Sequence, residues 1–378
     1  MKVLVTGTTW KIGMAAVHSL SKEGYTIIGT DDRSLPFKIH SRYIKSYYTH
    51  APYPDNNFYE DILSIIKKEN PDVLIPIGGT KQISFHKNEI SKYVNVLVPD
   101  YESFCRVYDK KKTHILCEET EIAVPKRFTD VEADCLLRNE KNTKLVIKPD
   151  FDIGGAHGLS IVDTIEELDT AKKNIRNMFG NYVVEEFIPG SLNMRAVQLV
   201  FNKGHKISAC FILKKIRQWP VTGGITAYAE STHEWELLEF IMPLFKKCPW
   251  EGPIEVELII DERDGKPKLI EINPRFAGSI AFAIQCGVNF PHTVCMDAMN
   301  KDHLVNTSNY DSGMFYINFS YYLKTILKEY SLAKSKSALL FQVFNELKQR
   351  KVGTVPDKKD FLVYLIKALM ELKNNLIS

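Results

Sequence analysis

The chain has 378 residues, of which 44% are hydrophobic and 25% charged, and its formal net charge is +3. This length exceeds one ordinary hydrophobic core, so we expect two or three domains. The small net charge, with basic and acidic residues interspersed, argues against nucleic acid as a partner. No stretch of 18 apolar residues occurs, so we expect no membrane span.

The cysteines and the N-terminus both favour a cytoplasmic protein. Seven cysteines are scattered along the chain without a Cys-x-x-Cys pair, which is typical of reduced thiols and gives no support to a zinc site. The N-terminus opens directly into KVLVTG at residues 2–7. It lacks the long apolar core of a secretory signal.

The first hundred residues alternate short apolar strands with amphipathic helices. This alternation is typical of a parallel sheet with helical crossovers, an α/β architecture. The pattern predicts strands at 3–5, 26–30, 72–77 and 94–98, and helices at 14–23, 58–69 and 101–119.

From residue 145 onward the predicted strands follow one another with few helices, which indicates an α+β unit distinct from the N-terminal region. Thr164 is the expected N-cap of a helix at 164–178, with Glu166 and Glu167 in its first turn. The predicted strands are 145–148, 159–162, 182–188, 194–201 and 206–213, and a further helix covers 235–246.

The last part of the chain, residues 310–378, is rich in aromatic residues and then in lysine. Residues 360–373 predict an amphipathic helix. We expect this helix to dock onto the body of the protein, as such helices do in most globular proteins. A membrane-surface or dimer helix is the alternative.

The most informative segment is residues 255–278. It reads as two strands joined by a tight turn at Asp264-Gly265. Because side chains two apart on a strand share a face, the polar residues of this hairpin project together. The opposite face is apolar and suited to burial.

A symmetrical hairpin places Glu257 opposite Glu271, and Glu255 opposite Asn273. Facing carboxylates repel unless a cation neutralises them. Mg²⁺ does this well, because it binds one or two carboxylates, an amide oxygen, waters and substrate phosphates. Arg275 follows at once and is suited to a phosphate or acyl phosphate. The alternative is an edge hairpin with a solvated acidic face.

A glycine-rich segment, residues 148–158, joins two predicted strands. It begins with Lys148 and contains Gly154, Gly155 and Gly158. Glycines let backbone N–H groups approach an anion closely, and the lysine adds a mobile positive charge. No Walker sequence follows. A flexible surface loop is the alternative.

The strand at 182–188 ends in Glu185 and Glu186, before a Pro-Gly turn. An exposed strand end offers backbone groups that can pair with an adenine edge. Apolar neighbours such as Ile147 and Phe187 are suited to sandwich the ring. An ordinary strand and turn is the alternative here.

Taken in order, the lysine–glycine loop, the Glu-Glu strand end and the Glu…Glu-x-Asn-x-Arg hairpin resemble the ATP-grasp superfamily, near carbamoyl phosphate synthase and biotin carboxylase. The resemblance covers about residues 1–300. It implies a Rossmann-like domain at 1–105, a small ATP-grasp lobe with the glycine-rich loop at 106–185 and a large lobe with the metal-binding hairpin at 186–305. A C-terminal helical extension at 306–378 would pack on the body.

The resemblance implies a role for each matching residue. The expected metal ligands are Glu257, Glu271 and Asn273. The expected nucleotide contacts are Lys110, Lys148, Gly154, Gly155, His157, Gly158, Glu185, Glu186, Phe187, Ile188 and Asn193. Lys148 would hold the α- and β-phosphates, and Arg275 would lie near the transferred phosphoryl group.

Two positions depart from the family pattern. His157 stands where the loop usually carries Arg or Lys. The acid expected to bind ribose after the strand end is absent, because Ser191, Leu192 and Asn193 stand there. We therefore expect Asn193 to substitute for it.

Residues 214–228 resemble a substrate-side segment of carboxylate–amine ligases in this superfamily. Arg217 is suited to pair with a substrate carboxylate and is a candidate catalytic residue with Lys148 and Arg275. Gly223-Gly224 would let the backbone approach a ligand. A basic surface hairpin is the alternative.

The N-terminal residues 7–13, with Asp31 after the second strand, imitate a dinucleotide fingerprint, but the spacing differs from G-x-G-x-x-G. We interpret Gly7 and Gly13 as turn and packing residues rather than an NAD site. Gly78-Gly79 follows another strand, where such sheets bind ligands, and is a candidate for lining the acceptor site.

We therefore predict an ATP-dependent ligase that activates a carboxylate as an acyl phosphate and joins it to an amine. Its cofactors would be ATP and two Mg²⁺ ions, with Mn²⁺ as a substitute. Its substrates would be a small-molecule acid and amine, amino acids among them, and a homodimer is suggested by family analogy. An NAD-dependent oxidoreductase and a non-catalytic nucleotide-binding protein are the alternatives.

Overall fold

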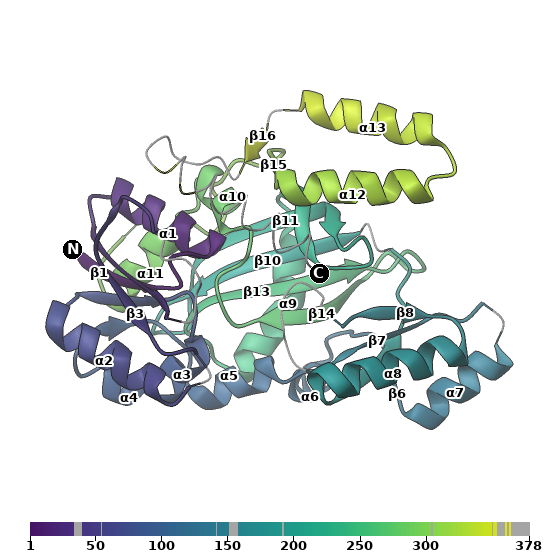
Figure 1. Cartoon of the computed structure of the whole chain (residues 1–378), viewed down its shortest axis with the longest axis horizontal. Helices are drawn as coiled ribbons and strands as arrows, with labels where there is room; N and C mark the ends of the chain where they lie inside the picture. Colours follow the sequence, from purple (N-terminus) through teal and green to yellow (C-terminus); the bar gives the residue numbers. More distant parts are fainter. Residues whose placement is uncertain are drawn as a thin grey trace.

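The computed structural model describes residues 1–33, 40–53, 55–140, 142–150, 158–190, 193–303, 305–349 and 351–353, together with Asp360 and Val363. These residues form a mixed α/β structure with three β-sheets and a pair of C-terminal helices (Figure 1). Within this part of the chain, no helix is long and apolar enough to cross a membrane.

The N-terminal sheet is parallel and has five strands in the order β3-β2-β1-β4-β5. The strands are β1 (Lys2–Thr6), β2 (Thr26–Asp32), β3 (Ile44–His50), β4 (Val73–Pro76) and β5 (Asn95–Val96). The helices are α1 (Lys11–Lys22), α2 (Asn57–Glu69), α3 (Thr80–Phe85), α4 (Lys87–Ile90) and α5 (Tyr101–Tyr108). The predicted strands are confirmed, whereas β3 was missed because its sequence, IKSYYTH, is largely polar.

The second sheet is antiparallel, in the order β6-β9-β7-β8. Its strands are β6 (Arg127–Phe128), β7 (Leu145–Pro149), β8 (Ser160–Val162) and β9 (Tyr182–Glu186), and its helices are α7 (Asp130–Asn139) and α8 (Ile165–Phe179). Both helices cover one face of the sheet (Figure 1). Thr164 caps α8 by accepting a hydrogen bond from the Glu167 amide, as its sequence predicts.

The third sheet has seven strands in the order β14-β13-β10-β11-β12-β15-β16. They are β10 (Met194–Phe201), β11 (Ile207–Trp219), β12 (Ile225–Thr232), β13 (Gly252–Ile260), β14 (Pro267–Asn273), β15 (Phe315–Ile317) and β16 (Lys351–Gly353). Strand β10 is buried along its whole length, because both faces of the sheet are covered. One face packs with α1, α10 (Ile280–Gln285) and α11 (Phe290–Ala298).

The other face of the seven-stranded sheet packs with α5, α6 (Lys110–Glu119) and α9 (Trp235–Lys247). Helix α6 leads from this region toward the four-stranded sheet (Figure 1). Helix α12 (Phe319–Leu332) packs along β11 and β12, and α13 (Lys336–Lys348) reaches these strands through Glu346, at the edge of the molecule (Figure 1).

The pairing of β13 with β14 agrees with the prediction at the end of the hairpin that carries the acidic residues, away from the loop. Glu255 lies opposite Asn273 and Glu257 lies opposite Glu271. The register then shifts by one, which leaves Ile270 as an extra residue on β14. The predicted tight turn is wrong, because the loop is longer: the Asp261 amide donates to the Lys266 carbonyl at 2.9 Å, and Gly265 adopts φ of +71°.

Asp360 begins the segment predicted as an amphipathic helix. It is fully buried and accepts hydrogen bonds from the Ser41 hydroxyl and, at 2.9 Å, from the Arg42 amide. Its carboxylate also pairs with His18 at 2.6 Å. The segment therefore touches the N-terminal sheet at its first residue, and the rest of 360–373, apart from Val363, lies outside the described residues.

Candidate functional site

A cavity of about 170 Å³ lies at the junction of the four-stranded and seven-stranded sheets. Strands β7, β11, β12, β13 and β14 and helix α6 all contribute side chains to it. The residues singled out from the sequence that line it are Lys110, Lys148, Gly223, Gly224, Glu255, Glu257, Glu271, Asn273 and Arg275. Residues that are distant in sequence, on α6, β7 and the β13–β14 hairpin, thus face one space.

The acidic hairpin face is compensated by two lysines that come from other elements. Lys215 of β11 pairs with Glu257 at 2.8 Å, and Lys110 of α6 pairs with Glu271 at 3.1 Å. Lys215 is buried, yet Glu257 and Glu255 hold the pKa of its ammonium group above the ordinary value against the effect of burial. Sequence reasoning missed Lys215 as a site residue.

Glu255 is the least compensated acid of the site. Burial, followed by repulsion from Glu257, raises the pKa of its carboxyl to about 7. Asn273 donates to it from Nδ2 at 3.3 Å, and the guanidinium of Arg275 donates to the Asn273 side-chain oxygen at 3.0 Å. This chain of contacts orients the amide, with its NH2 group toward Glu255 and its oxygen toward Arg275.

The donor set at this position suits a hard cation. Two facing carboxylates, Glu257 and Glu271, and one amide oxygen, from Asn273, are the oxygen ligands that Mg²⁺ prefers. The described residues contain no group of three histidine, cysteine, aspartate or glutamate side chains gathered as a metal site.

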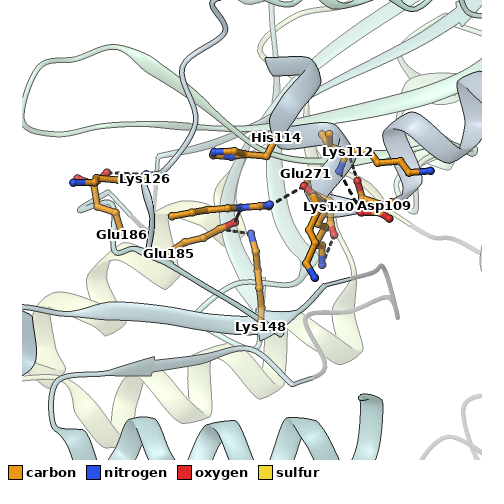
Figure 2. A network of polar contacts seen from close by, with 12 residues as sticks. Asp109, Lys110, Lys112, His114, Lys126, Lys148, Glu185, Glu186 and Glu271 are labelled. Atoms are coloured by element: carbon orange, nitrogen blue, oxygen red, sulfur yellow. Dashed lines mark hydrogen bonds and ion pairs between the residues drawn. The ribbon is translucent and has the colours of Figure 1, made fainter. Parts of the chain in front are cut away.

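A second charged group lies at the neighbouring sheet (Figure 2). Glu185 is buried and pairs with Lys148 at 2.6 Å and with Arg127 at 3.1 Å. These two cations lower the pKa of the Glu185 carboxyl, although burial alone would raise it. Arg127 also donates to the Lys110 carbonyl at 2.8 Å, which ties β6 to the start of α6.

Arg127 was missed by sequence reasoning. The only signal was its place on the short segment after Pro125, which pairs with the Glu-Glu strand and sets Arg127 opposite Glu185. A small hollow of about 20 Å³ opens beside this pair, between Val124 and Pro125 on one side and Leu269 and Ile270 on the other. It lies next to the predicted adenine-contacting strand end.

The strand end itself is held by several contacts. Glu186 pairs with Arg263 at 2.6 Å, and its backbone amide donates to the Lys126 carbonyl at 2.8 Å. Ile188 is buried against Met194 and Ile259, and Phe187 is partly buried. This strand end thereby connects the two sheets that flank the cavity.

Asn193 donates from its side chain to Glu262 at 3.4 Å. Glu262 comes from the hairpin loop, and its amide donates to the Pro189 carbonyl at 3.1 Å. An acid thus does stand beside this turn, although it is supplied from a distant part of the chain and no local motif could reveal it. Ser191 and Leu192 lie outside the described residues.

The glycine-rich loop is only partly described. Gly154, Gly155 and His157 lie outside the described residues. Gly158 has φ of +77°, and a Cβ there would lie 2.9 Å from Phe179 and Pro149. Glycine is therefore required at Gly158 by backbone conformation and by packing.

Arg217 does not line the cavity with Lys215. Its guanidinium makes two hydrogen bonds of 2.9 Å to Glu346 of α13 and a further contact to Glu329 of α12. Residues two apart on a strand normally share a face, but the β11–β12 register shifts on both sides of Arg217. The irregularity aims Lys215 into the cavity and Arg217 toward the C-terminal helices.

The N-terminal sheet offers little room for a dinucleotide. Tyr53 fills the crevice at the carboxyl ends of β1 and β4, so that a Cβ on Gly78 would lie 2.3 Å from its ring. Gly7 and Gly79 also pack against Tyr53. Asp31 accepts hydrogen bonds from Thr8 and Thr9. Gly7 and Gly13 are therefore packing residues, as predicted, because a Cβ on Gly13 would lie 2.1 Å from the Gly7 carbonyl oxygen. Gly78 and Gly79, the candidates for lining the acceptor site, are closely packed by the Tyr53 ring.

Comparison with known proteins agrees with this geometry. Residues 107–279 match the family model of the ATP-grasp domain. The chain is 25% identical over 279 residues to a D-aspartate ligase of Enterococcus faecium, covering 67% of this chain and 66% of that protein. It is 24% identical over 278 residues to the carbamoyl phosphate synthase large chain of Thermotoga petrophila, covering 70% of this chain but 24% of that protein.

Solved structures show the same fold. The biotin carboxylase domain of a Hydrogenobacter thermophilus 2-oxoglutarate carboxylase superposes with a TM-score of 0.66 and 15% identity, over 83% of this chain and 73% of that one. That structure was determined with MgADP and bicarbonate. An L-amino acid ligase from Bacillus licheniformis gives a TM-score of 0.60 at 15% identity, over 79% of this chain and 74% of that one.

Proposed function

We propose that this chain, an ATP-grasp protein through its residues 107–279, is an ATP-dependent ligase that joins a carboxylate to an amine. The observation that carries the proposal is the cavity in which Glu257 and Glu271 face each other beside Asn273, with Arg275, Lys110 and Lys148 around them. Facing acids inside a ring of cations suit a bound magnesium–nucleotide complex.

The metal and phosphates would be held by opposite charges. Glu257, Glu271 and Asn273 would hold Mg²⁺, two ions in our proposal, with Mn²⁺ as a substitute; the metal neutralises charge on the transferred phosphoryl group. Lys110 and Lys148 would contact the phosphates, together with the loop residues Gly154, Gly155, His157 and Gly158. Since Lys110 and Lys215 pair with the acids in the ligand-free chain, cation binding would release both lysines toward phosphate oxygens.

The adenine would lie beside Glu185, against the backbone of Glu186, Phe187 and Ile188. Asn193, with the neighbouring Glu262, would contact the ribose. This arrangement gives Glu185 a positioning role, because it fixes Lys148 and Arg127 on the two sides of the nucleotide.

The reaction would proceed in two steps. A carboxylate oxygen of the acid attacks the γ-phosphorus of ATP, the bond to ADP breaks, and an acyl phosphate forms. The amine then attacks the acyl carbon, phosphate leaves, and the amine loses its proton as the amide forms. Arg275 would stabilise the negative charge on the phosphoryl group in both steps, while the protein mainly positions the reactants.

Arg217 takes a different role from the one its sequence suggests. Because its guanidinium is bound by Glu346 and Glu329, we assign it to structure. Lys215, which points into the cavity, is the better candidate for an anionic substrate or phosphate.

The parts of the chain would divide the work. A Rossmann-like domain at 1–105 would support the acceptor side, the small lobe at 106–185 would cover the triphosphate, and the large lobe at 186–305 would carry the metal. The extension at 306–378 would pack on the large lobe. We further propose an amino acid as one substrate, because the similar proteins include a D-aspartate ligase and an L-amino acid ligase, and a cytoplasmic location.

The test is an assay of ADP release with MgATP over pairs of amino acids and other small acids and amines. We expect ADP release that requires both partners and yields an amide. Thermal-shift titration should show stabilisation by MgATP and none by NAD, since Tyr53 fills the dinucleotide crevice. Stabilisation by NAD alone would favour an oxidoreductase, and MgATP binding without turnover on any pair would favour a nucleotide-binding protein without catalysis.

A further inference from the structure

The exposed apolar side chains of the protein gather on one element, the C-terminal hairpin formed by α12 and α13, residues 319–349. Of the 17 large hydrophobic side chains exposed in the described chain, nine belong to this hairpin. They are Phe319, Leu323, Leu327, Tyr330, Leu332, Leu340, Phe341, Phe344 and Leu347. A large cluster of exposed apolar side chains is typical of a surface that binds another protein, a membrane or a ligand.

Their spacing makes them stripes. On α12 they recur at Phe319, Leu323, Leu327 and Tyr330, which is one face of a helix. The inward face of the same helix is separate: Tyr322 is buried against the sheet. The outward stripe is therefore additional to the face that the fold itself uses.

Helix α13 repeats this arrangement. Leu340, Phe344 and Leu347 form its outward stripe, while Leu339 and Glu346 are buried. In Figure 1 both helices form one border of the molecule, away from α7 and α8 of the four-stranded sheet. In the part of the chain that the structure describes, no other element covers this border, so an extended surface could contact it.

The acidic and basic side chains of the hairpin face different ways: the acids face the protein and the lysines face its surface. Its acidic residues are Glu329 and Glu346, and both turn inward to the buried Arg217. Its lysines are at the surface or partly exposed: Lys324, Lys328, Lys334, Lys336 and Lys348. The outward side thus presents mainly positive charge, since Glu346 is buried and the Glu329 side chain is 21% exposed.

The lysines also lie against the apolar stripes. The Lys336 ammonium is 4.9 Å from the Tyr330 ring centre, and the Lys348 ammonium is 4.1 Å from that of Phe344. Lysines that lay their stems on apolar surface and keep their charge at its edge are suited to an interface between hydrocarbon and water.

We propose that the α12–α13 hairpin docks on an anionic lipid surface, with its apolar stripes among the acyl chains and its lysines among the headgroups. The charge of the hairpin favours an anionic bilayer over a second copy of the chain as the partner of this surface. A second copy would bring five lysines against five lysines, while the two acids of each hairpin are already paired with Arg217. An anionic bilayer instead attracts each lysine near it by about fivefold in partition. The apolar stripes and the basic rim match the two layers of a membrane surface.

The experiment is sedimentation of the full chain with vesicles of phosphatidylcholine alone or mixed equally with phosphatidylglycerol. We expect binding to the mixed vesicles that weakens as salt increases, and little binding to the neutral ones. Leu327→Gln combined with Phe344→Gln should reduce partition at least about tenfold, because two buried apolar side chains are lost. Lys328→Gln combined with Lys336→Gln should reduce it by about 25-fold.

Matched control variants distinguish binding by the hairpin from non-specific adsorption of other exposed side chains to the vesicles. Phe85 and Met178 are as exposed as the two stripe residues but lie on other helices, so Phe85→Gln with Met178→Gln should leave partition unchanged. Lys173→Gln with Lys246→Gln is the control for charge. Because all eight positions are at the surface, each variant should fold, which circular dichroism checks.

Several results would overturn the proposal. These are no binding to anionic vesicles, equal binding to neutral ones, or equal losses in the hairpin and control variants. A dimer that Leu327→Gln with Phe344→Gln dissociates, without vesicle binding by the parent chain, would assign the surface to a second copy. Binding to an acidic protein instead of to vesicles would likewise reject it. None of these outcomes bears on ADP release.

Discussion

Two buried charge clusters lie on the same strand, β11, and they differ in how fully their charges are matched. In the latch cluster, Arg217 faces Glu346 and Glu329. Both oxygens of Glu346 are occupied, since Tyr322 and Gln342 also donate to them at 2.7 and 3.2 Å. Burial alone would lower the pKa of Arg217, but these acids hold it above its ordinary value.

The site cluster, only two residues away, is matched incompletely. Three acids, Glu255, Glu257 and Glu271, share Lys215 and Lys110 around an open cavity. Burial, and then repulsion from Glu257, raises the pKa of Glu255. We expect the self-matched latch cluster to stabilise the fold, whereas the acids of the site cluster border an open cavity and are suited to bind a cation.

The largest effect should come from removing a metal ligand. Glu271→Ala should lower the rate of ADP formation by more than about a thousandfold, because the phosphoryl group loses its charge stabilisation. The circular dichroism spectrum should not change. Glu239→Ala, at an exposed position on α9, is the control. Near-normal turnover by Glu271→Ala would exclude the proposed metal role.

A substitution in the latch cluster should instead lower the free energy of unfolding. Glu346→Ala leaves the buried Arg217 without its bidentate partner, which should cost about 3–5 kcal/mol of unfolding free energy. Urea denaturation measures this, with the exposed Glu118→Ala as the control. If Glu346→Ala lost less than about 1 kcal/mol, the latch cluster would not stabilise the fold as a buried ion pair.

Glu255→Gln should instead stabilise the protein, by roughly 3 kcal/mol at pH 8. The folded pKa of about 7 exceeds the ordinary carboxyl value of 4.5. The parent chain therefore loses stability as pH rises between these values, and the variant escapes this loss. The gain should vanish near pH 4.5, where the carboxyl is largely protonated in the folded state. Equal urea midpoint shifts at pH 5 and pH 8 would contradict it.

The smallest effect concerns the amide of the site. Asn273→Ala removes one proposed oxygen ligand of the metal. It also removes the amide NH2 group that donates a hydrogen bond to Glu255. The magnesium concentration for half-maximal activity should rise about tenfold. Titration of activity with MgCl₂ at saturating ATP checks this, and an unchanged magnesium requirement would argue against Asn273 as a ligand.

The sequence predicted those features that depend on local order. The period of two in β13 and β14 determines which side chains share a face, and the assumption of a symmetrical hairpin gives the pairs Glu255–Asn273 and Glu257–Glu271. The bulge at Ile270 and the longer loop escaped prediction, because a one-residue shift near the turn leaves the alternation at the site end unchanged.

Other features depend on which distant segments meet. Arg127 gains its meaning from lying opposite Glu185, and Glu262 from lying beside Asn193. No pattern in the neighbourhood of either residue indicates these contacts.

By itself, the amino-acid order determined the α/β and α+β character, the family resemblance and the acidic hairpin, since periodicity and motif order are properties of short segments. Only the tertiary structure decided that Lys215 enters the cavity while Arg217 leaves it, because strand irregularity and two carboxylates from helices far along the chain set those directions. Charges are assigned to partners by proximity in space, which the chain reaches only after its sheets and helices have packed.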